Sequence, residues 1–381
     1  MKPPKVLEQS IAVFGESGSG KTVLLSSFYG AMQEAEFDRT SLYNVTADDV
    51  SQGIRLHKNY LGMRNADKRP PTNKFRASRY AFSARFKGDS RKRASVDALR
   101  LVWHDYPGDW FEETPVNAEE GRRRVETFKQ LLGADVALVL VDGQRLVEES
   151  GQEEKYLKLL MTNLRNGLLS LKDGLLADEG RLTNFPRIWV MALSKADLLP
   201  HMDVYDFRDL LIEKAGDDLD ALRRAVGELV EADEALALGA DFVLLSSAKF
   251  DAERIRVLDR VGVDLIHPMA AVLPLETHAR WASLKALPAK VGDALLENVD
   301  GLAGLLVGRR VPLPLPGPAG VLAGLLGPRI AKAAADLAGG KLKQVHATAL
   351  EKQEYAAATL AAFKLALEDA ERAKVLLRGL E

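Results

Sequence analysis

A glycine-rich stretch near the start of the sequence has the composition of a phosphate-binding loop. It reads Gly15-Glu16-Ser17-Gly18-Ser19-Gly20-Lys21-Thr22 and matches the pattern G-x-x-x-x-G-K-[ST]. Glycines let the backbone curl so that several N–H groups point into one concavity, where they bind phosphate oxygens. Lys21 then supplies charge to the β- and γ-phosphates, and Thr22 offers a hydroxyl to Mg2+. An apolar run before the loop and a helical stretch after it are the required context, and both are present at 11–14 and 20–33.

A second polar group follows another apolar run, in Trp103-His104-Asp105-Tyr106-Pro107-Gly108. A carboxylate at the end of a strand beside a phosphate loop can hold Mg2+ through water, so Asp105 is a candidate metal ligand. Gly108 can offer its N–H to a γ-phosphate, and hydrolysis would then release the loop. Asp-x-x-Gly alone is a common turn, and it gains meaning here from its place after a phosphate-loop strand.

Two further strand ends carry groups suited to a purine base. In Ser194-Lys195-Ala196-Asp197 the carboxylate can accept hydrogen bonds from the N1–H and exocyclic amine of guanine, a donor pair that adenine lacks. The Lys195 stem can lie along the base plane while its ammonium stays solvated. In Ser246-Ser247-Ala248-Lys249 the backbone N–H of Ala248 can meet the guanine oxygen.

The elements that would position these groups alternate between strand and helix. Short apolar runs lie at 11–14, 80–86, 98–103, 136–141, 188–193 and 242–245, and helical stretches at about 20–33, 118–132, 153–175, 205–215 and 217–235. This alternation predicts an α/β fold with a mostly parallel sheet and helices on both faces. All four polar motifs then fall at the carboxyl ends of strands, where open α/β sheets bind ligands. Residues 35–77 are polar and predict a mobile loop with short helices.

This ordered set of motifs resembles the TRAFAC class of P-loop GTPases over about residues 11–265. Within that class the stretch Asp-Tyr-Pro-Gly-Asp-Trp is similar to the bacterial YcjX-like and double-GTPase groups. The resemblance implies a Ras-like three-layer sandwich with six strands, the second antiparallel to the rest. It also implies Mg2+ as cofactor and GTP and GDP as substrate and product, held by Gly15 to Thr22, Ser194, Lys195, Asp197, Ser247, Ala248 and Lys249.

The same resemblance predicts a threonine that reaches Mg2+ and the γ-phosphate. Thr72 is our choice, because it lies just before the second of the six runs, and Thr40 and Thr46 are its rivals. The catalytic set is then Lys21, Thr72, Gly108 and Asp109, and the metal ligands are Thr22, Thr72 and Asp105. Arg76 or Arg79 could supply an arginine finger from within the same chain, although solvated arginines beside a strand are commoner.

Two residues depart from the family pattern. Ser194 stands where Asn or Thr is usual, which weakens the bracing of the base loop, the segment 194–197 that would bind guanine. Asp109 stands where many members place a His or Gln that orients the attacking water. A carboxylate repels the γ-phosphate unless a metal or Arg offsets it, so the sequence predicts slow intrinsic hydrolysis. We expect a protein partner or activator, a second copy of the chain, or another residue to complete the site.

Composition excludes several other classes. The 381 residues contain no cysteine, which rules out disulfides, iron–sulfur clusters and thiol catalysis, and six scattered His show no zinc spacing. A formal net charge of -2 argues against a strongly basic nucleic-acid binder. The first residues lack the apolar core of a signal peptide, so we expect a cytoplasmic protein.

The C-terminal third predicts helices of unassigned role. We expect a GTPase domain at 1–265, with insertions at about 35–77 and 145–184, and an α-helical region at 266–381. The latter contains helices at about 274–299 and 341–380 and, within 301–335, a run of 18 uncharged residues from Val311 to Pro328. Its prolines and glycines argue against a membrane span. Packing against protein is favoured over contact with a membrane surface, since apolar loops are usually covered.

The last helix places an apolar face at three/four spacing, which predicts packing on 274–299, with a coiled-coil partner as the alternative. Together these features predict a Mg2+-dependent GTPase that acts as a switch, with the C-terminal helices as output or partner-binding element. A nucleotide-dependent scaffold, or a membrane-associated dynamin-like protein with little hydrolysis, is the alternative. An ATP-using kinase leaves Lys195, Asp197 and Ala248 unexplained.

Overall fold

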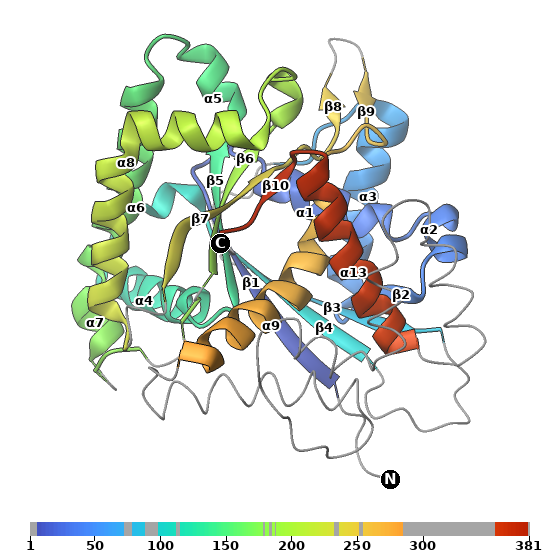
Figure 1. Cartoon of the computed structure of the whole chain (residues 1–381), viewed down its shortest axis with the longest axis horizontal. Helices are drawn as coiled ribbons and strands as arrows, with labels where there is room; N and C mark the ends of the chain where they lie inside the picture. Colours follow the sequence, from blue (N-terminus) through green and yellow to red (C-terminus); the bar gives the residue numbers. More distant parts are fainter. Residues whose placement is uncertain are drawn as a thin grey trace.

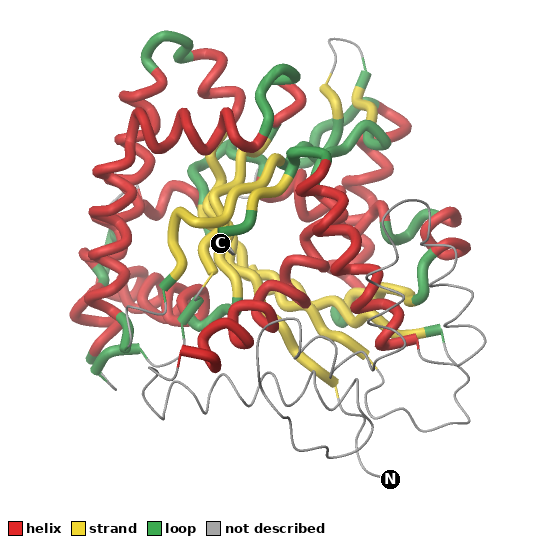
Figure 2. Tube along the Cα trace, viewed as in Figure 1, coloured by secondary structure: helices red, strands yellow, loops and turns green. Residues whose placement is uncertain are grey.

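The computed structural model (Figure 1) describes residues 6–71, 78–87, 98–111, 115–177, 180–182, 185–186, 188–231, 236–250, 254–284 and 355–379. These residues form an α/β fold around a central sheet, with helices on both of its faces (Figure 2). The sheet strands are β1 Val6–Phe14, β2 Tyr43–Ala47, β3 Ser78–Phe86, β4 Ala98–Asp105, β5 Val136–Asp142, β6 Ile188–Ser194, β7 Ala237–Leu244 and β10 Leu376–Leu377. Strands β8 Lys249–Phe250 and β9 Ile255–Arg256 form a separate small hairpin.

In the described residues the sheet has eight strands, in the order β10-β7-β6-β5-β1-β4-β3-β2. The central pairings, from β7 through β6, β5 and β1 to β4, are parallel, whereas β3, β2 and β10 join antiparallel. The predicted mostly parallel sheet with an antiparallel second strand is therefore confirmed. The expected number of six was too small, because β2 and β10 extend the two edges. Parallel pairing brings the ends of β1, β4, β5 and β6 to one edge.

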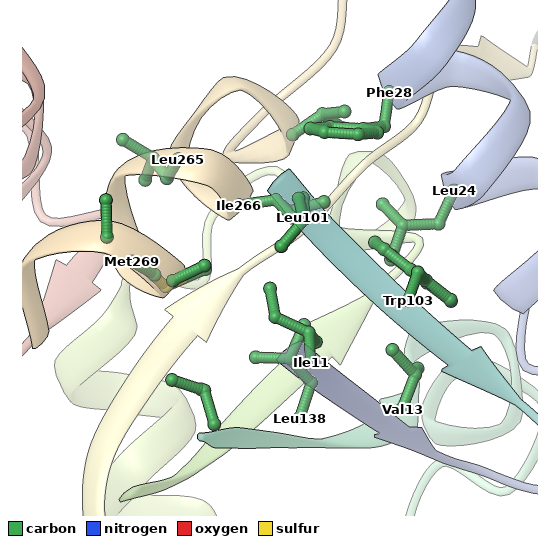
Figure 3. Packing of buried hydrophobic residues seen from close by; sticks show 14 of the residues in the cluster. Ile11, Val13, Leu24, Phe28, Leu101, Trp103, Leu138, Leu265, Ile266 and Met269 are labelled. Atoms are coloured by element: carbon green, nitrogen blue, oxygen red, sulfur yellow. The ribbon is translucent and has the colours of Figure 1, made fainter. Parts of the chain in front are cut away.

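Two apolar clusters cover the two faces of the sheet. On one face α1 (Lys21–Ala31), α9 (Ile266–Leu284) and α13 (Tyr355–Arg372) pack on side chains from β1, β4 and β5. Figure 3 shows Phe28 of α1 and Met269 of α9 turned toward this face, with Trp103 of β4. On the other face lie α4 (Ala118–Leu132), α6 (Glu153–Ser170) and α8 (Val204–Leu229). Every residue of β5 and β6 is buried, which explains their unbroken apolar sequences.

The segment predicted as a mobile loop contains a strand and a long helix. Helix α2 (Ala35–Thr40) is followed by β2 and then by α3 (Val50–Ala66), which begins at an Asp49 side chain that accepts from the N–H groups of Ser51 and Gln52. The helix was missed because its apolar face is narrow, with Leu56, Tyr60 and Met63 buried among polar residues. Other elements in the predicted insertion 145–184 are α5 (Gly143–Glu148) and α7 (Lys172–Leu176).

The C-terminal elements belong to the same core as the sheet. Helices α9 and α13 pack on each other (Figure 1). Leu360, Phe363 and Leu367 of α13 are buried. This favours the internal packing that the apolar spacing predicted. Helix α13 ends at Arg372, earlier than predicted, and β10 then pairs with β7. Arg378, which follows β10, forms ion pairs with Glu276 at 2.6 Å and with Glu371.

The apolar segment 301–335 lies outside the described residues. No helix in the part of the chain that the structure describes is both long and apolar enough to cross a membrane.

Candidate functional site

One cavity of about 540 Å3 lies at the edge of the sheet where the parallel strands end. Residues from all four predicted motifs line it: Ser17 to Thr22 of the glycine-rich loop, Asp105 and Gly108, Ser194, Lys195 and Asp197, and Ser247 and Ala248. The structure thus brings together groups that are up to about 230 residues apart in sequence. A volume of this size suits a nucleotide-sized ligand.

The glycine-rich loop connects β1 to α1 in the shape expected for phosphate binding. Gly18 and Gly20 have φ values of 86° and 95°, in the left-handed region that favours glycine. Helix α1 begins without a side-chain cap, so its first N–H groups face the loop. The Lys21 ammonium donates to the carbonyls of Gly15 (2.6 Å) and Glu16 (3.0 Å), which holds this charge inside the loop.

The segment after β4 packs directly against the glycine-rich loop. The Gly15 N–H donates to the Tyr106 hydroxyl at 2.9 Å, and the Lys21 ammonium lies 5.3 Å from the Tyr106 ring. A Cβ on Gly108 would stand 2.1 Å from the Ser17 nitrogen, so only glycine permits this approach. The sequence motif therefore has a steric basis as well as the proposed role of its N–H.

Asp105 is a buried carboxylate with spare acceptor capacity. Its side chain lines the cavity, the residue is 5% exposed, and its Oδ1 has no hydrogen-bond partner. Burial raises the pKa of Asp105 to about 6, against the lowering effects of the Lys21 ammonium and the Tyr106 backbone N–H. The Ser19 hydroxyl, in the facing loop, is also buried without a partner. These orphaned oxygens fit a cation or a phosphate group placed between them.

Asp197 forms the other end of the cavity. One of its carboxylate oxygens lies 2.7 Å from the Ser246 hydroxyl, and the other accepts from the Phe250 N–H at 3.3 Å. Each oxygen has two lone pairs, so capacity remains for a ligand in the cavity. Ser246 also lies 2.9 Å from the Ala248 carbonyl, which ties the loop after β7 to Asp197.

Lys195 and Ser194 are held by β5. The Lys195 ammonium is bound to Asp142 at 2.7 Å rather than solvated as predicted, and the Ser194 hydroxyl donates to the Val141 carbonyl. The serine therefore braces the base loop against β5, in spite of its departure from the usual Asn or Thr.

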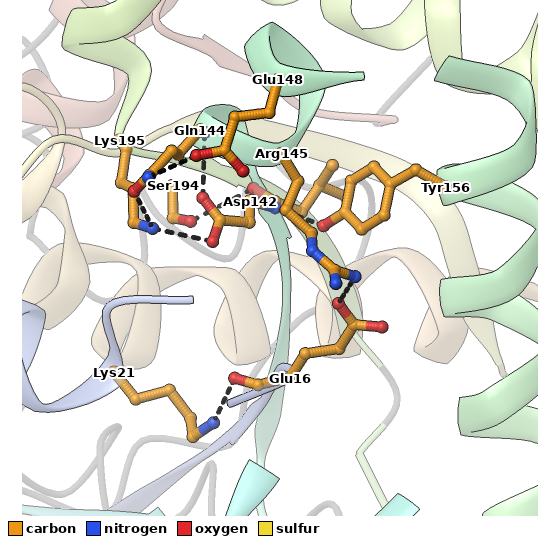
Figure 4. A network of polar contacts seen from close by, with 10 residues as sticks. Glu16, Lys21, Asp142, Gln144, Arg145, Glu148, Tyr156, Ser194 and Lys195 are labelled. Atoms are coloured by element: carbon orange, nitrogen blue, oxygen red, sulfur yellow. Dashed lines mark hydrogen bonds and ion pairs between the residues drawn. The ribbon is translucent and has the colours of Figure 1, made fainter. Parts of the chain in front are cut away.

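Some predicted residues do not line the cavity. Gly15, Glu16 and Lys249 do not, and the buried Glu16 carboxylate is bound by Arg145 at 3.0 Å (Figure 4). Thr72, Arg76 and the side chain of Asp109 lie outside the described residues. Among their rivals, Thr40 donates to the Glu36 carbonyl within α2, and Thr46 is exposed on the edge strand β2. Arg79 pairs with Glu8 at 3.1 Å and does not line the cavity either.

Asp142 and Arg69 are among the groups near the cavity that the sequence motifs did not indicate. Asp142 directly follows the apolar run 136–141, the same strand-end position as Asp105, and this position was the available signal. Arg69 lines the cavity with its guanidinium 5.3 Å from the Phe250 ring. No local pattern distinguishes Arg69 from other loop arginines, because its partner lies far away in sequence.

Comparison with known proteins gives one family match. The family model described as Double-GTPase 2 matches residues 9–198, which include the glycine-rich loop, Asp105 and Asp197. No curated protein sequence matches the chain.

Two similar solved structures share little sequence with the chain. One is Methanosarcina barkeri Roco2 RocCORdC bound to GDP, with 11% identity, coverage of 98% of this chain and 96% of that chain, and a TM-score of 0.24. The other is the conserved domain of the dynein light intermediate chain, with 10% identity, coverage of 77% and 97%, and a TM-score of 0.20. Scores this low carry no weight for fold or function.

Proposed function

We propose that the chain, whose residues 9–198 match the Double-GTPase 2 family model, is a GTP-binding protein that hydrolyses GTP to GDP with Mg2+ and acts as a switch. The observation that carries this proposal is that one and the same cavity is lined by both the glycine-rich loop and Asp197. A phosphate site and a guanine-selective carboxylate at opposite ends of one cavity fit one guanine nucleotide. A TRAFAC-class assignment is part of the same proposal.

Each end of the cavity contributes a different interaction. The loop N–H groups and Lys21 bind the phosphates, while the free lone pairs of Asp197 accept from the guanine N1–H and amine. The Ala248 N–H meets the guanine oxygen, and Gly108 offers its N–H to the γ-phosphate. Lys195 lies along the base, with its ammonium on Asp142.

The residues present fit Mg2+. Thr22 and Asp105 both line the cavity, and the unpartnered, buried Oδ1 of Asp105 is suited to a hard cation. Thr72 is proposed as a further ligand. When bound, Mg2+ would neutralise negative charge on the phosphates and stabilise the charge that develops during transfer.

Hydrolysis is proposed to be slow in the isolated protein. Asp109 follows Gly108 where a water-orienting side chain is usual, and its charge opposes an approaching phosphate. An activating partner or a second copy of the chain would then complete the site. The same residue favours the alternative, a nucleotide-dependent scaffold that scarcely turns over. We further propose a cytoplasmic protein whose C-terminal elements transmit the nucleotide state.

Nucleotide titrations test the proposal. The purified protein should bind GDP and GTP at least 100-fold more tightly than ATP, since adenine lacks the donor pair that Asp197 needs. Asp197→Asn should invert the base preference toward xanthine nucleotides, whose oxygen replaces the guanine amine. Equal affinity for ATP and GTP would refute the base-pocket assignment. Turnover with and without Mg2+ then separates the switch from the scaffold.

A further inference from the structure

A buried carboxylate that no motif includes lies between the two ends of the nucleotide cavity. Asp142 is the last residue of β5 and is 5% exposed. Its Oδ1 accepts from the Gln144 N–H at 2.9 Å and caps α5, and its Oδ2 accepts from the Lys195 ammonium at 2.7 Å. Figure 4 shows Asp142 in contact with Gln144 of α5 and with Lys195.

The same helix is also fixed to the glycine-rich loop. Arg145 of α5 donates to the Glu16 carboxylate at 3.0 Å, and its guanidinium lies 5.4 Å from the Tyr156 ring. The Tyr156 hydroxyl in turn accepts from the Asp142 N–H at 2.8 Å. Helix α5 therefore has one polar attachment on the phosphate side and one on the base side (Figure 4).

Lys195 needs such an attachment. Its backbone is in the left-handed region, with φ 53° and ψ 38°, which a residue other than glycine rarely adopts. Its side chain is long and has many rotamers, and ordering it during binding costs free energy. The Asp142 carboxylate holds the ammonium in place before any ligand arrives. Close packing supports the arrangement, because a Cβ on Gly143 would stand 2.6 Å from the Ser194 carbonyl oxygen.

We propose that Asp142 is a positioning residue for guanine-nucleotide binding, which acts by holding Lys195 along the base and does not itself touch the nucleotide. This inference rests on the proposed function and adds a determinant of affinity to it. The competing explanation is that Asp142 only caps α5. The two explanations separate experimentally because Asn is as good a cap as Asp but carries no charge.

A double-mutant cycle on GDP affinity tests the inference. Asp142→Asn should raise the Kd for GDP about tenfold, mainly through faster release, and so should Lys195→Met. The double variant should bind no more than about twofold more weakly than Lys195→Met, because both changes break one interaction. Effects that multiply to about 100-fold, or an unchanged Kd for Asp142→Asn, would overturn the inference. Asp142→Ser, which also retains a cap, serves as the second variant if Asp142→Asn fails to fold.

Asp203→Asn is the matched control. Asp203 caps α8 and binds Lys374 at 2.8 Å, but it does not line the cavity. Its replacement should leave the Kd for GDP unchanged within about twofold, and an equal loss there would point to general loosening and overturn the inference. The preference of Asp142→Asn for guanine over xanthine should persist, since Asp197 is intact. Failure of the wild-type chain to bind any guanine nucleotide would instead refute the proposed function, and the inference with it.

Discussion

Burial of the Asp105 carboxylate should lower the stability of the nucleotide-free protein by an amount that can be predicted. Its pKa of about 6 lies above the ordinary value of 3.8, because the ionised form is desolvated. At about 1.4 kcal/mol per pKa unit, this difference corresponds to about 3 kcal/mol. The folded state therefore loses up to that much stability when Asp105 ionises. Asp105→Asn removes the charge and nearly preserves the shape, so it should stabilise the protein.

The size of this effect depends on pH. Below pH 3.8 the carboxyl is protonated in both states and has no cost. Between pH 3.8 and about 6 the carboxyl ionises in the unfolded chain but stays protonated in the folded protein. The free energy of unfolding therefore falls over this range, and the full loss is reached above about pH 6. Asp105→Asn should accordingly raise the free energy of unfolding by up to about 3 kcal/mol at pH 7.5 and by almost nothing at pH 4.

Urea unfolding without nucleotide, in EDTA, measures this difference at a series of pH values. Asp142→Asn is the matched control, since Asp142 is also 5% exposed but is paired with Lys195, and its loss should not stabilise the protein. Adding Mg2+ and GDP should reverse the order, because the wild-type carboxylate then gains a cation. Absence of stabilisation at pH 7.5, or a difference that is constant with pH, would refute the reasoning.

Three further predictions follow from close contacts and buried charges. Gly108→Ala places a Cβ 2.1 Å from the Ser17 nitrogen and should weaken GDP binding at least tenfold in a titration, whereas an unchanged Kd would contradict this packing. Arg378→Ala strands the buried Glu276 and should cost about 3–5 kcal/mol in urea unfolding, with partial rescue by Glu276→Gln. Burial lowers the pKa of His267 to about 4, so the wild-type free energy of unfolding should fall by up to about 3 kcal/mol as pH drops from 6.5 to 4. His267→Leu should abolish this fall, and equal pH profiles of the two proteins would count against it.

Much of the site could be predicted because its signals are local. The glycine-rich loop, Asp105 and Asp197 each begin within four residues of the end of a short apolar run, and a buried parallel strand has a recognisable sequence. The parallel sheet then places the ends of those runs at one edge. Elements without a strong local pattern were missed: α3 presents few apolar residues, and β10 has only two residues. Such elements are specified by the surfaces on which they pack.

The phosphate loop, the order of the motifs and the strands that hold them follow from the sequence alone, because each depends on neighbouring residues. Which side chains meet depends on how the chain folds. Lys195 binds Asp142, 53 residues away in sequence, and Arg145 binds Glu16, 129 residues away. Strand β10, near the end of the chain, pairs with β7 in the sheet that also contains β1. Contacts of this kind depend on the register of β5 with β6, which sets Asp142 opposite Ser194, and no local pattern encodes that register.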